Sequence, residues 1–244
     1  MSTSTGFYRW ESRCELVSSH AEEAAIYYEW LLGLGAGSRP GDALRRVGVD
    51  DVRLPQQEEP SGWLPVFFVD DAEEALGRLG SGDWSRALVE RGGELRCYVS
   101  DERGVRVRLD TRAEAPADDP ASRSAVNFDC ATPHLAETAE FYARLLGLRV
   151  VEVPEDRYDM RLLCDDQGVT AGVFRLHGMG ELGRRPFWIT YFEVDSVEDS
   201  ITRAVHSGSR VRIPPADSPF NRYAVLDDPW GNLYGFSTMH DAHH

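Results

Sequence analysis

The chain has 244 residues, of which 42% are hydrophobic and 27% are charged, and these fractions are typical of a globular protein. Its formal net charge of −15 disfavours nucleic acids and anionic membrane surfaces as partners. No apolar run is long enough to span a membrane, and the absence of lysine excludes Schiff-base chemistry on that residue.

The cysteines and the N-terminal segment indicate a compartment. The four cysteines, Cys14, Cys97, Cys130 and Cys164, are widely spaced and form no CxxC pair. This pattern favours reduced thiols over a disulfide framework. Residues 1–15 carry neither the basic nor the apolar region of a secretory signal. We therefore expect a cytoplasmic protein.

An internal repeat divides the chain. The segment "HAEEAAIYYEWLLGLG" matches "HLAETAEFYARLLGLR", and "WLPVFFVDDAEEAL" matches "WITYFEVDSVEDSI" later in the chain. A third pair, "SDERGVRVRLDT" and "LDDPWGNLYGFST", follows in the same order. Between the halves lies a segment rich in alanine, proline and acidic residues, which is typical of a linker. The repeat predicts a domain over residues 1–112, a linker over 113–123 and a second domain over 124–240.

The second half begins with a predicted strand and helix. A strand over residues 126–131 is followed by Thr132 as a helix cap and Pro133 as the first helical residue. Gly147 can end this helix. Two further strands are predicted over residues 161–164 and 170–176.

The same order then recurs. A strand over residues 187–194 precedes a helix over 197–206. Asp228-Pro229-Trp230-Gly231 is the signature of a type I turn, and it predicts a hairpin between apolar strands. Each half therefore holds two β-α-β-β-β modules, which makes four modules in the chain.

These segments resemble the vicinal oxygen chelate superfamily, which includes glyoxalase I, extradiol dioxygenases and bleomycin-resistance proteins. The motifs that carry the resemblance are "TPHLAETAEFYARLLGL", "WITYFEVDSVEDSI" and "DPWGNLYGF". The resemblance covers nearly the whole chain and looks most like tandem members common in actinomycetes. It implies an α+β fold, a tandem pair of domains in which four βαβββ modules form curled mixed sheets around a cup that holds a ligand.

Metal-using members of that superfamily place a histidine on the first strand of a module and a glutamate on the last. The last strands of the first and third modules do not align with those positions, and none of the six positions that align holds a His, Glu, Asp, Gln or Cys. They are Asn127, Ile189 and Gly235 in the second domain and Arg13, Leu64 and Arg108 in the first. A divalent ion needs several such ligands. We expect a site that has lost its metal, with no other cofactor.

Strand alternation predicts which side chains face the cup of the second domain. Asn127 and Asp129 face it from one strand, and Ile189, Tyr191 and Glu193 face it from another. We name Asp129, Glu193 and Tyr191 as candidate catalytic residues. Gly235 has no side chain and is expected to leave room for the ligand. Neighbouring segments add further candidate ligand-binding residues, namely Tyr158, Arg161, Trp188, Asn221, Arg222, Tyr223 and Trp230.

Structural roles stay open for many of these residues. Asp129 can pair with a neighbouring arginine, Trp188 and Tyr191 can be core aromatics, and Glu193 can be solvated. In the first domain the corresponding cup positions are Arg13, Glu15, Arg106 and Arg108, which suit an anion or a structural ion-pair cluster.

Two classes of function remain. The first is a binding protein for an oxygen-rich aromatic or polycyclic small molecule in specialised metabolism or self-resistance. The second is a metal-independent acid–base enzyme, such as an isomerase, cyclase or hydrolase, that uses the same cup. A metal-dependent lyase or dioxygenase is disfavoured by the absent ligands. The expected partner is a small molecule, and a homodimer stays open.

Overall fold

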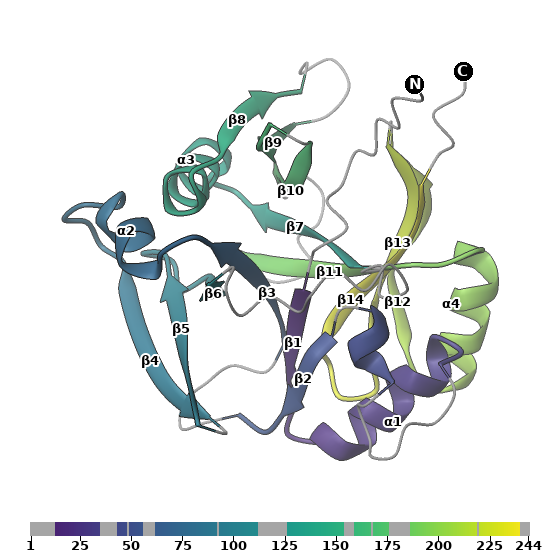
Figure 1. The fold of residues 1–244 in the computed structure, drawn as a ribbon. Helices are drawn as coiled ribbons and strands as arrows, with labels where there is room; N and C mark the ends of the chain where they lie inside the picture. The colour runs from purple at the N-terminus through teal and green to yellow at the C-terminus, as the bar shows by residue number, and fades with distance from the viewer. Residues whose placement is uncertain are drawn as a thin grey trace, which may run out of the picture. The chain divides into compact units, whose positions relative to one another are not determined.

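The structure is a computed structural model. It describes residues 13–34, 43–47, 49–55, 62–91, 93–111, 126–153, 159–166, 168–175, 186–218 and 220–239. Fourteen strands, four α-helices and one 3-10 helix lie in this part of the chain (Figure 1).

The chain divides into two compact units that each combine distant segments. Unit 1 comprises Met1–Leu64, Asp119–Asn127 and Ile189–His244, and unit 2 comprises Pro65–Asp118 and Phe128–Trp188. The division runs through three strands, of which each unit holds a part. They are β3 (Gly62–Val69), β7 (Val126–Thr132) and β11 (Phe187–Glu193). The predicted tandem domains, over residues 1–112 and 124–240, stay a prediction.

Unit 1 contains parallel and antiparallel strand pairs. β1 pairs with β2 in parallel, β11 pairs with β14 in parallel, and β12, β13 and β14 form an antiparallel run. Its remaining elements are β1 (Arg13–Val17), α1 (Ala21–Leu31), the 3-10 helix η1 (Leu44–Val47), β2 (Val49–Arg53), α4 (Val197–His206), β12 (Arg210–Asp217), β13 (Asn221–Asp227) and β14 (Leu233–Met239).

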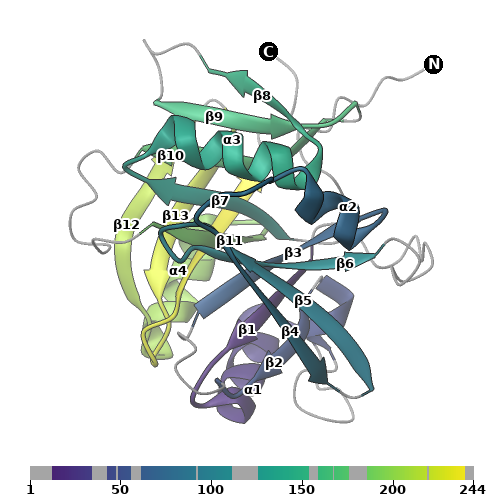
Figure 2. The same cartoon turned by 90° about the vertical axis from the view of Figure 1, so that its left-hand side faces the viewer.

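Unit 2 has the same kinds of pairing. β4, β5 and β6 are antiparallel with β3 parallel to β6, while β8, β9 and β10 are antiparallel with β7 parallel to β10. Figure 2 shows α3 running beside β9 and β10. Its remaining elements are α2 (Ala72–Gly77), β4 (Ser85–Arg91), β5 (Glu94–Ser100), β6 (Arg106–Thr111), α3 (Leu135–Leu146), β8 (Arg149–Glu152), β9 (Met160–Cys164) and β10 (Val169–Arg175).

The order of elements reproduces the predicted modules. The strand–helix–three-strand order recurs from β3 to β6, from β7 to β10 and from β11 to β14. In the first module the described residues contain β1, α1, η1 and β2. The mixture of parallel and antiparallel strands with few helices is an α+β fold, as the sequence predicted.

Local signals explain where the helices begin and end. Gly147 adopts φ +68°, and the backbone N–H of Leu148 reaches back to the Ala143 carbonyl at 2.8 Å, which is how a glycine ends a helix. The prediction that Thr132 caps α3 is wrong by two residues, because His134 is the N-cap. The Thr132 hydroxyl instead accepts a hydrogen bond from the His134 N–H at 3.0 Å and tightens the preceding turn.

The predicted hairpin at Asp228 is confirmed. The Gly231 N–H donates to the Asp228 carbonyl at 3.0 Å, which closes the turn. The Asp228 side chain also accepts hydrogen bonds from the backbone N–H groups of Trp230 and Asn232. This carboxylate therefore organises the whole connection between β13 and β14.

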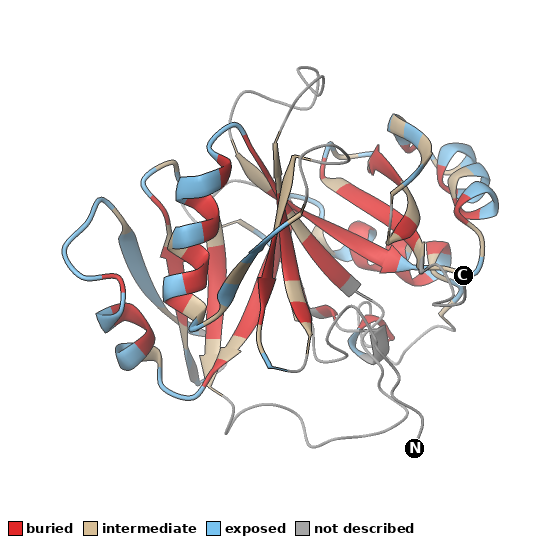
Figure 3. Cartoon of the chain, turned by 90° about the horizontal axis from the view of Figure 1, so that it is seen from above, coloured by how far each residue is buried: buried red, intermediate tan, exposed pale blue. Residues whose placement is uncertain are grey.

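Burial follows the amphipathic pattern of the elements. Figure 3 shows helices that are buried along one side and exposed along the other. On α3, Tyr142 and Leu145 are fully buried, and they pack over the sheet. All four cysteines are free thiols and are buried, as the sequence predicted. Among the described residues, no helix has the length and apolar character that crossing a membrane requires.

Candidate functional site

Polar and aromatic side chains gather on one face of the C-terminal strands in unit 1. Tyr191 on β11 lies opposite Gly235 on β14, and Tyr223 on β13 lies opposite Ser237. The rings of Tyr191 and Tyr223 meet edge to face at 6.2 Å. Asn127 donates to the Ser237 hydroxyl at 3.4 Å. The structure thus brings Asn127, Tyr191, Tyr223 and Gly235 together on these strands.

The space beside Gly235 is filled by protein. A Cβ atom built at Gly235 would lie 2.3 Å from Cδ1 of Tyr191 and 2.9 Å from the Ala224 carbonyl oxygen. The expectation that this glycine leaves room for a ligand is therefore wrong. The glycine instead lets the Tyr191 ring pack against β14, and Tyr191 is 3% exposed.

Asp129 occupies a niche in unit 2 that another glycine creates. Asp129 on β7 pairs with Gly172 on β10. A Cβ atom built at Gly172 would lie 2.2 Å from Oδ1 of Asp129 and 2.7 Å from Cε of Met160. Only glycine at position 172 therefore admits the carboxyl group. Oδ1 is enclosed and has no hydrogen-bond partner within the described part of the chain.

This environment favours the neutral form of Asp129. Burial raises the pKa of the carboxyl group to about 7, and the backbone N–H of Gly172 offsets only part of that effect. The residue as a whole is partly exposed, although Oδ1 is enclosed. Near neutral pH Asp129 can therefore either donate or accept a proton.

The surroundings of Asp129 are mostly apolar. In the antiparallel pair of β9 and β10, Leu162 lies opposite Gly172 and Met160 lies opposite Phe174. Directly opposed residues project on the same face, so these side chains share the face of Asp129. Thr170 on β10 also has an enclosed hydroxyl oxygen without a partner among the described residues, and it lies where the register of β9 and β10 shifts. The partly exposed carboxyl group of Asp129 on a mostly apolar face is suited to an organic ligand with oxygen functions.

The side chains at the superfamily's metal positions do not fit a divalent ion. Ile189 is fully buried and apolar, Gly235 has no side chain, and the Asn127 amide is bound to Ser237. Within the described ranges, no three His, Cys, Asp or Glu side chains converge. A hard divalent cation needs several oxygen or nitrogen ligands at one point. Metal independence itself stays a prediction, because it concerns the protein in solution.

Arginines predicted to contact the ligand make ion pairs instead. Arg161 on β9 pairs with Glu152 at 2.7 Å. Arg222 on β13 pairs with Glu198 at 2.5 Å and with Asp217 at 3.0 Å. These pairs lie at the surface and join neighbouring elements.

Other predicted ligand-binding residues also have protein contacts. Trp188 is buried in unit 2, where its ring meets those of Tyr142 at 5.0 Å and Phe67 at 5.7 Å. Trp230 stacks on His20 at 5.8 Å in unit 1. The Asn221 side chain accepts a hydrogen bond from Ser218 at 2.6 Å. Their roles in ligand binding stay predictions, and the contacts give each a structural role.

Glu193 and Tyr158 are the two remaining candidate residues. Glu193 ends β11 and is exposed, which matches the solvated alternative. Tyr158 lies outside the described residues.

Sequence reasoning missed the residues that shape the Asp129 niche. Gly172 and Met160 lie beside the carboxyl group, but only the strand register brings Gly172 next to Asp129. One signal was available, because an isolated glycine within a strand pattern indicates close approach of another group. Ser237, the partner of Asn127, was missed for the same reason of register.

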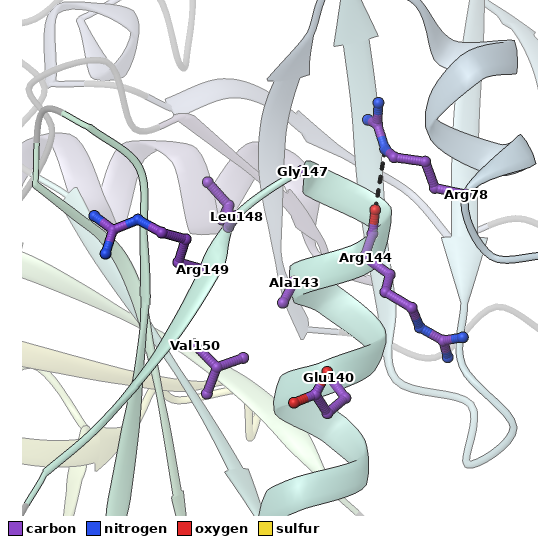
Figure 4. Close-up of a pocket in the computed structure, with 8 residues that line it drawn as sticks. All are labelled: Arg78, Glu140, Ala143, Arg144, Gly147, Leu148, Arg149 and Val150. Atoms are coloured by element: carbon purple, nitrogen blue, oxygen red, sulfur yellow. Dashed lines mark hydrogen bonds between the residues drawn. The ribbon is translucent and has the colours of Figure 1, made fainter.

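Unit 2 also has an open depression beside the end of α3, with a volume of about 720 Å³. Its lining includes Arg78, Arg144 and Arg149 (Figure 4). Arg78 donates to the Arg144 and Leu145 carbonyls, both at 3.1 Å, and so caps the C-terminus of α3. The guanidinium group is engaged in holding α2 against α3, so we do not place the ligand here.

Comparison with known proteins relates the second half of the chain to a superfamily. The model of the Glyoxalase/Bleomycin resistance protein/Dioxygenase superfamily matches residues 126–236. Residues 126–236 belong to this superfamily. The anthracycline biosynthesis protein DauV of Streptomyces sp. (strain C5) is 31% identical over 121 residues. That alignment covers 46% of this chain and 40% of DauV, so the chain matches less than half of that relative's length.

Solved structures extend the superfamily fold to nearly the whole chain. The 2,2',3-trihydroxybiphenyl 1,2-dioxygenase of Sphingomonas wittichii strain RW1 is 14% identical with a TM-score of 0.59, covering 95% of this chain and 90% of that one. The Mn(II)-bound glyoxalase of Novosphingobium aromaticivorans is 13% identical with a TM-score of 0.59, covering 95% and 82%. At these identities the similarity shows the vicinal oxygen chelate fold and not the activity.

Proposed function

We propose that this glyoxalase-superfamily protein binds an oxygen-rich aromatic small molecule in specialised metabolism. The observation that carries the proposal is Asp129, whose enclosed Oδ1 lacks a partner among the described residues on a face formed with Met160, Leu162 and Phe174. The similarity to an anthracycline biosynthesis protein supports an aromatic, polycyclic ligand. The free thiols support a cytoplasmic location.

Aromatic probes of graded polarity test the proposal on the full chain. Fluorene, fluorenone and naphthylmethylammonium are titrated by calorimetry, and at least one is expected to bind with a Kd below about 1 mM. Met160→Trp should abolish that binding, because the larger side chain fills the face beside Asp129. The matched control is Val205→Trp on α4, where Val205 is 47% exposed. Absence of binding by all three probes, or equal loss in both variants, would reject the site.

A second function, metal-independent acid–base catalysis, is favoured by the raised pKa of Asp129. A carboxyl group with a pKa of about 7 is matched to proton transfer at neutral pH. If the bound molecule is converted, Asp129→Asn should lower turnover by about 10²–10⁴. Mass spectrometry of each probe after incubation with the wild-type protein measures conversion. Turnover that survives the substitution would remove Asp129 from the mechanism.

A further inference from the structure

The repeated modules provide an internal comparison for Asp129. The repeat places Glu15 on β1 at the position that Asp129 has on β7. In unit 1, Glu15 pairs with Asp51 and Val17 pairs with Arg53 on the parallel strand β2. In unit 2, Asp129 pairs with Gly172 and Ala131 pairs with Phe174 on the parallel strand β10. Arg53 and Phe174 therefore occupy equivalent positions, each two residues beyond the partner of the carboxylate.

Glu15, the carboxylate of the first module, forms a buried ion pair with Arg53. Arg53 contacts Oε1 of Glu15 through Nη2 at 2.7 Å and through Nε at 3.0 Å. The two side chains are 2% and 0% exposed. This buried carboxylate therefore has a structural partner of opposite charge.

The carboxyl group of the third module lacks that counter-charge. Phe174 stands where the arginine would be, and no ion pair to Asp129 exists within the described residues. The nearest arginines on adjacent strands have their own carboxylates, since Arg175 pairs with Asp159 and Arg161 pairs with Glu152.

Other titratable groups near β7 supply no positive charge. Cys130 is next to Asp129 in sequence and is fully buried, and Asp101 acts on Cys130 electrostatically. On α3, which packs over β9 and β10, the titratable residues are Glu137, Glu140, Tyr142 and Arg144. Arg144 is exposed at the C-terminal end of α3.

We infer that the ligand carries an uncharged carbonyl oxygen, of the ketone or quinone class, which accepts a hydrogen bond from the carboxyl group of Asp129. The inference rests on the proposed function and specifies the ligand of that same site. Because Phe174 stands in place of an arginine, no positive charge offsets the burial of the carboxyl group, and its neutral form is favoured up to about pH 7. A neutral carboxyl group is a strong donor, and a carbonyl oxygen is the matching acceptor.

Anionic, cationic and carbonyl ligands differ in the protonation state of Asp129 that they favour. An anionic ligand would place a second negative charge beside a carboxyl group that has no cation to balance it. A cationic amine would favour the ionised carboxylate and would bind more tightly as the pH rises. A carbonyl ligand binds the neutral form and loses affinity as the pH rises through about 7. The sign of the pH dependence therefore distinguishes the classes.

Fluorenone and fluorene differ by the carbonyl group and provide a matched pair of probes. Calorimetry at about pH 6 and about pH 8 should show fluorenone binding more tightly than fluorene, with a roughly tenfold loss of fluorenone affinity at the higher pH. Fluorene affinity should not change. Asp129→Asn keeps an N–H donor but cannot titrate, so its fluorenone affinity should be the same at both pH values.

Phe174→Arg transfers the counter-charge of the first module to the third. The arginine should lower the pKa of Asp129, because a nearby positive charge favours the ionised carboxylate, and should abolish the preference for fluorenone over fluorene. Carbon-13 NMR titration of the Asp129 carboxyl group measures the change directly without a ligand. Phe174→Leu is the control, because it shortens the side chain without adding charge.

The outcomes separate this inference from the proposed function. Equal binding of fluorene and fluorenone leaves an aromatic binding site but overturns the carbonyl assignment. Tighter binding of naphthylmethylammonium at the higher pH would assign a cationic ligand instead. An Asp129 that titrates near pH 4 in the free protein also overturns it, because the donor would be absent at neutral pH. Absence of binding by all three probes rejects the proposed function itself.

Discussion

At the scale of single residues, two glycines have opposite consequences for the side chains that face them. Gly235 makes room for the ring of Tyr191, which closes the space. Gly172 makes room for the carboxyl group of Asp129, which keeps an oxygen without a partner in the described part of the chain. A glycine within a strand therefore completes packing in one case and admits a carboxyl group with an unpartnered oxygen in the other.

The raised pKa of Asp129 makes stability depend on pH. The folded-state pKa of about 7 lies above the ordinary value of 3.8, so the unfolded chain loses the proton first as the pH rises. Stability therefore falls between about pH 4 and pH 7, by at most about 4 kcal/mol, and is level above that range. Asp129→Asn should stabilise the protein most above pH 7. Denaturant titration at several pH values measures the difference, and Glu193→Gln at an exposed position is the control.

Gly172→Ala tests the niche itself. The added Cβ would overlap Oδ1 of Asp129, so either the carboxyl group or Met160 must move. We expect a loss of stability of about 1–3 kcal/mol, the usual cost of overpacking. Gly77→Ala on α2 has no atom within 4 Å of the added Cβ and should be neutral or stabilising. Thermal denaturation compares the two, and equal effects would show that the niche imposes no special constraint.

At the scale of elements, local signals in the sequence were sufficient for the modules. The turn at Asp228, the glycine at the end of α3 and the helix over Val197–His206 were all predicted, because each depends on residues close together in the chain. The contacts that decide the site depend on register between strands. Alternation predicted that Asp129 and Tyr191 leave the helix side of their strands, but it could not predict that Gly172 and Gly235 lie opposite them.

Long-range contacts in unit 1 also could not be predicted from neighbouring residues in the sequence. The Tyr28 hydroxyl on α1 donates to Oδ2 of Asp228 at 3.1 Å, and Trp63 donates to the same hydroxyl at 3.3 Å. Burial raises the pKa of Tyr28 well above its ordinary value, and nearby Asp228 acts in the same direction. Tyr28 therefore stays neutral and acts as a donor to the turn carboxylate. Nothing in either segment alone indicates that residues 28 and 228 are partners.

Tyr28→Phe should measure how strongly this contact joins the two segments. The substitution leaves Trp63 Nε1 without its acceptor and removes one donor to Asp228, which keeps Asn232 and Trp230 as donors. We expect a loss of about 1–3 kcal/mol, because a buried donor becomes unsatisfied. Chemical denaturation of both proteins provides the measurement. A loss below about 0.5 kcal/mol would show that solvent satisfies the indole.

At the scale of the whole molecule, the fold is that of the superfamily, and residues 126–236 match its model. The positions at which the resemblance implies metal ligands hold Asn127, Ile189 and Gly235 in this chain. We expect elemental analysis of protein purified without chelators to show no stoichiometric divalent metal. About one Zn, Fe, Ni or Mn per chain, with ligand binding lost on its removal, would contradict this expectation.

The two compact units imply that the sequence halves depend on each other. Unit 1 combines α1 from the first half with β13 and β14 from the second, and Tyr28 meets Phe192 at 5.8 Å and Tyr234 at 5.3 Å. If residues 124–240 were produced alone, they would lose the ring of Tyr28 from this aromatic cluster and would expose apolar surface.

We therefore expect the isolated second half to be less stable than the full chain and to self-associate. Residues 1–112, produced together with it as a separate chain, should co-purify with it and restore the melting temperature. Tyr28→Ala in the first-half fragment should weaken that association, because it removes the ring together with the hydroxyl donor to Asp228. Ile26→Ala, which truncates a 53% exposed side chain of the same helix, should leave it unchanged. A second half that is monomeric and as stable as the full chain would instead show that the tandem domains fold independently, because the contact with Tyr28 would then contribute nothing to the fold.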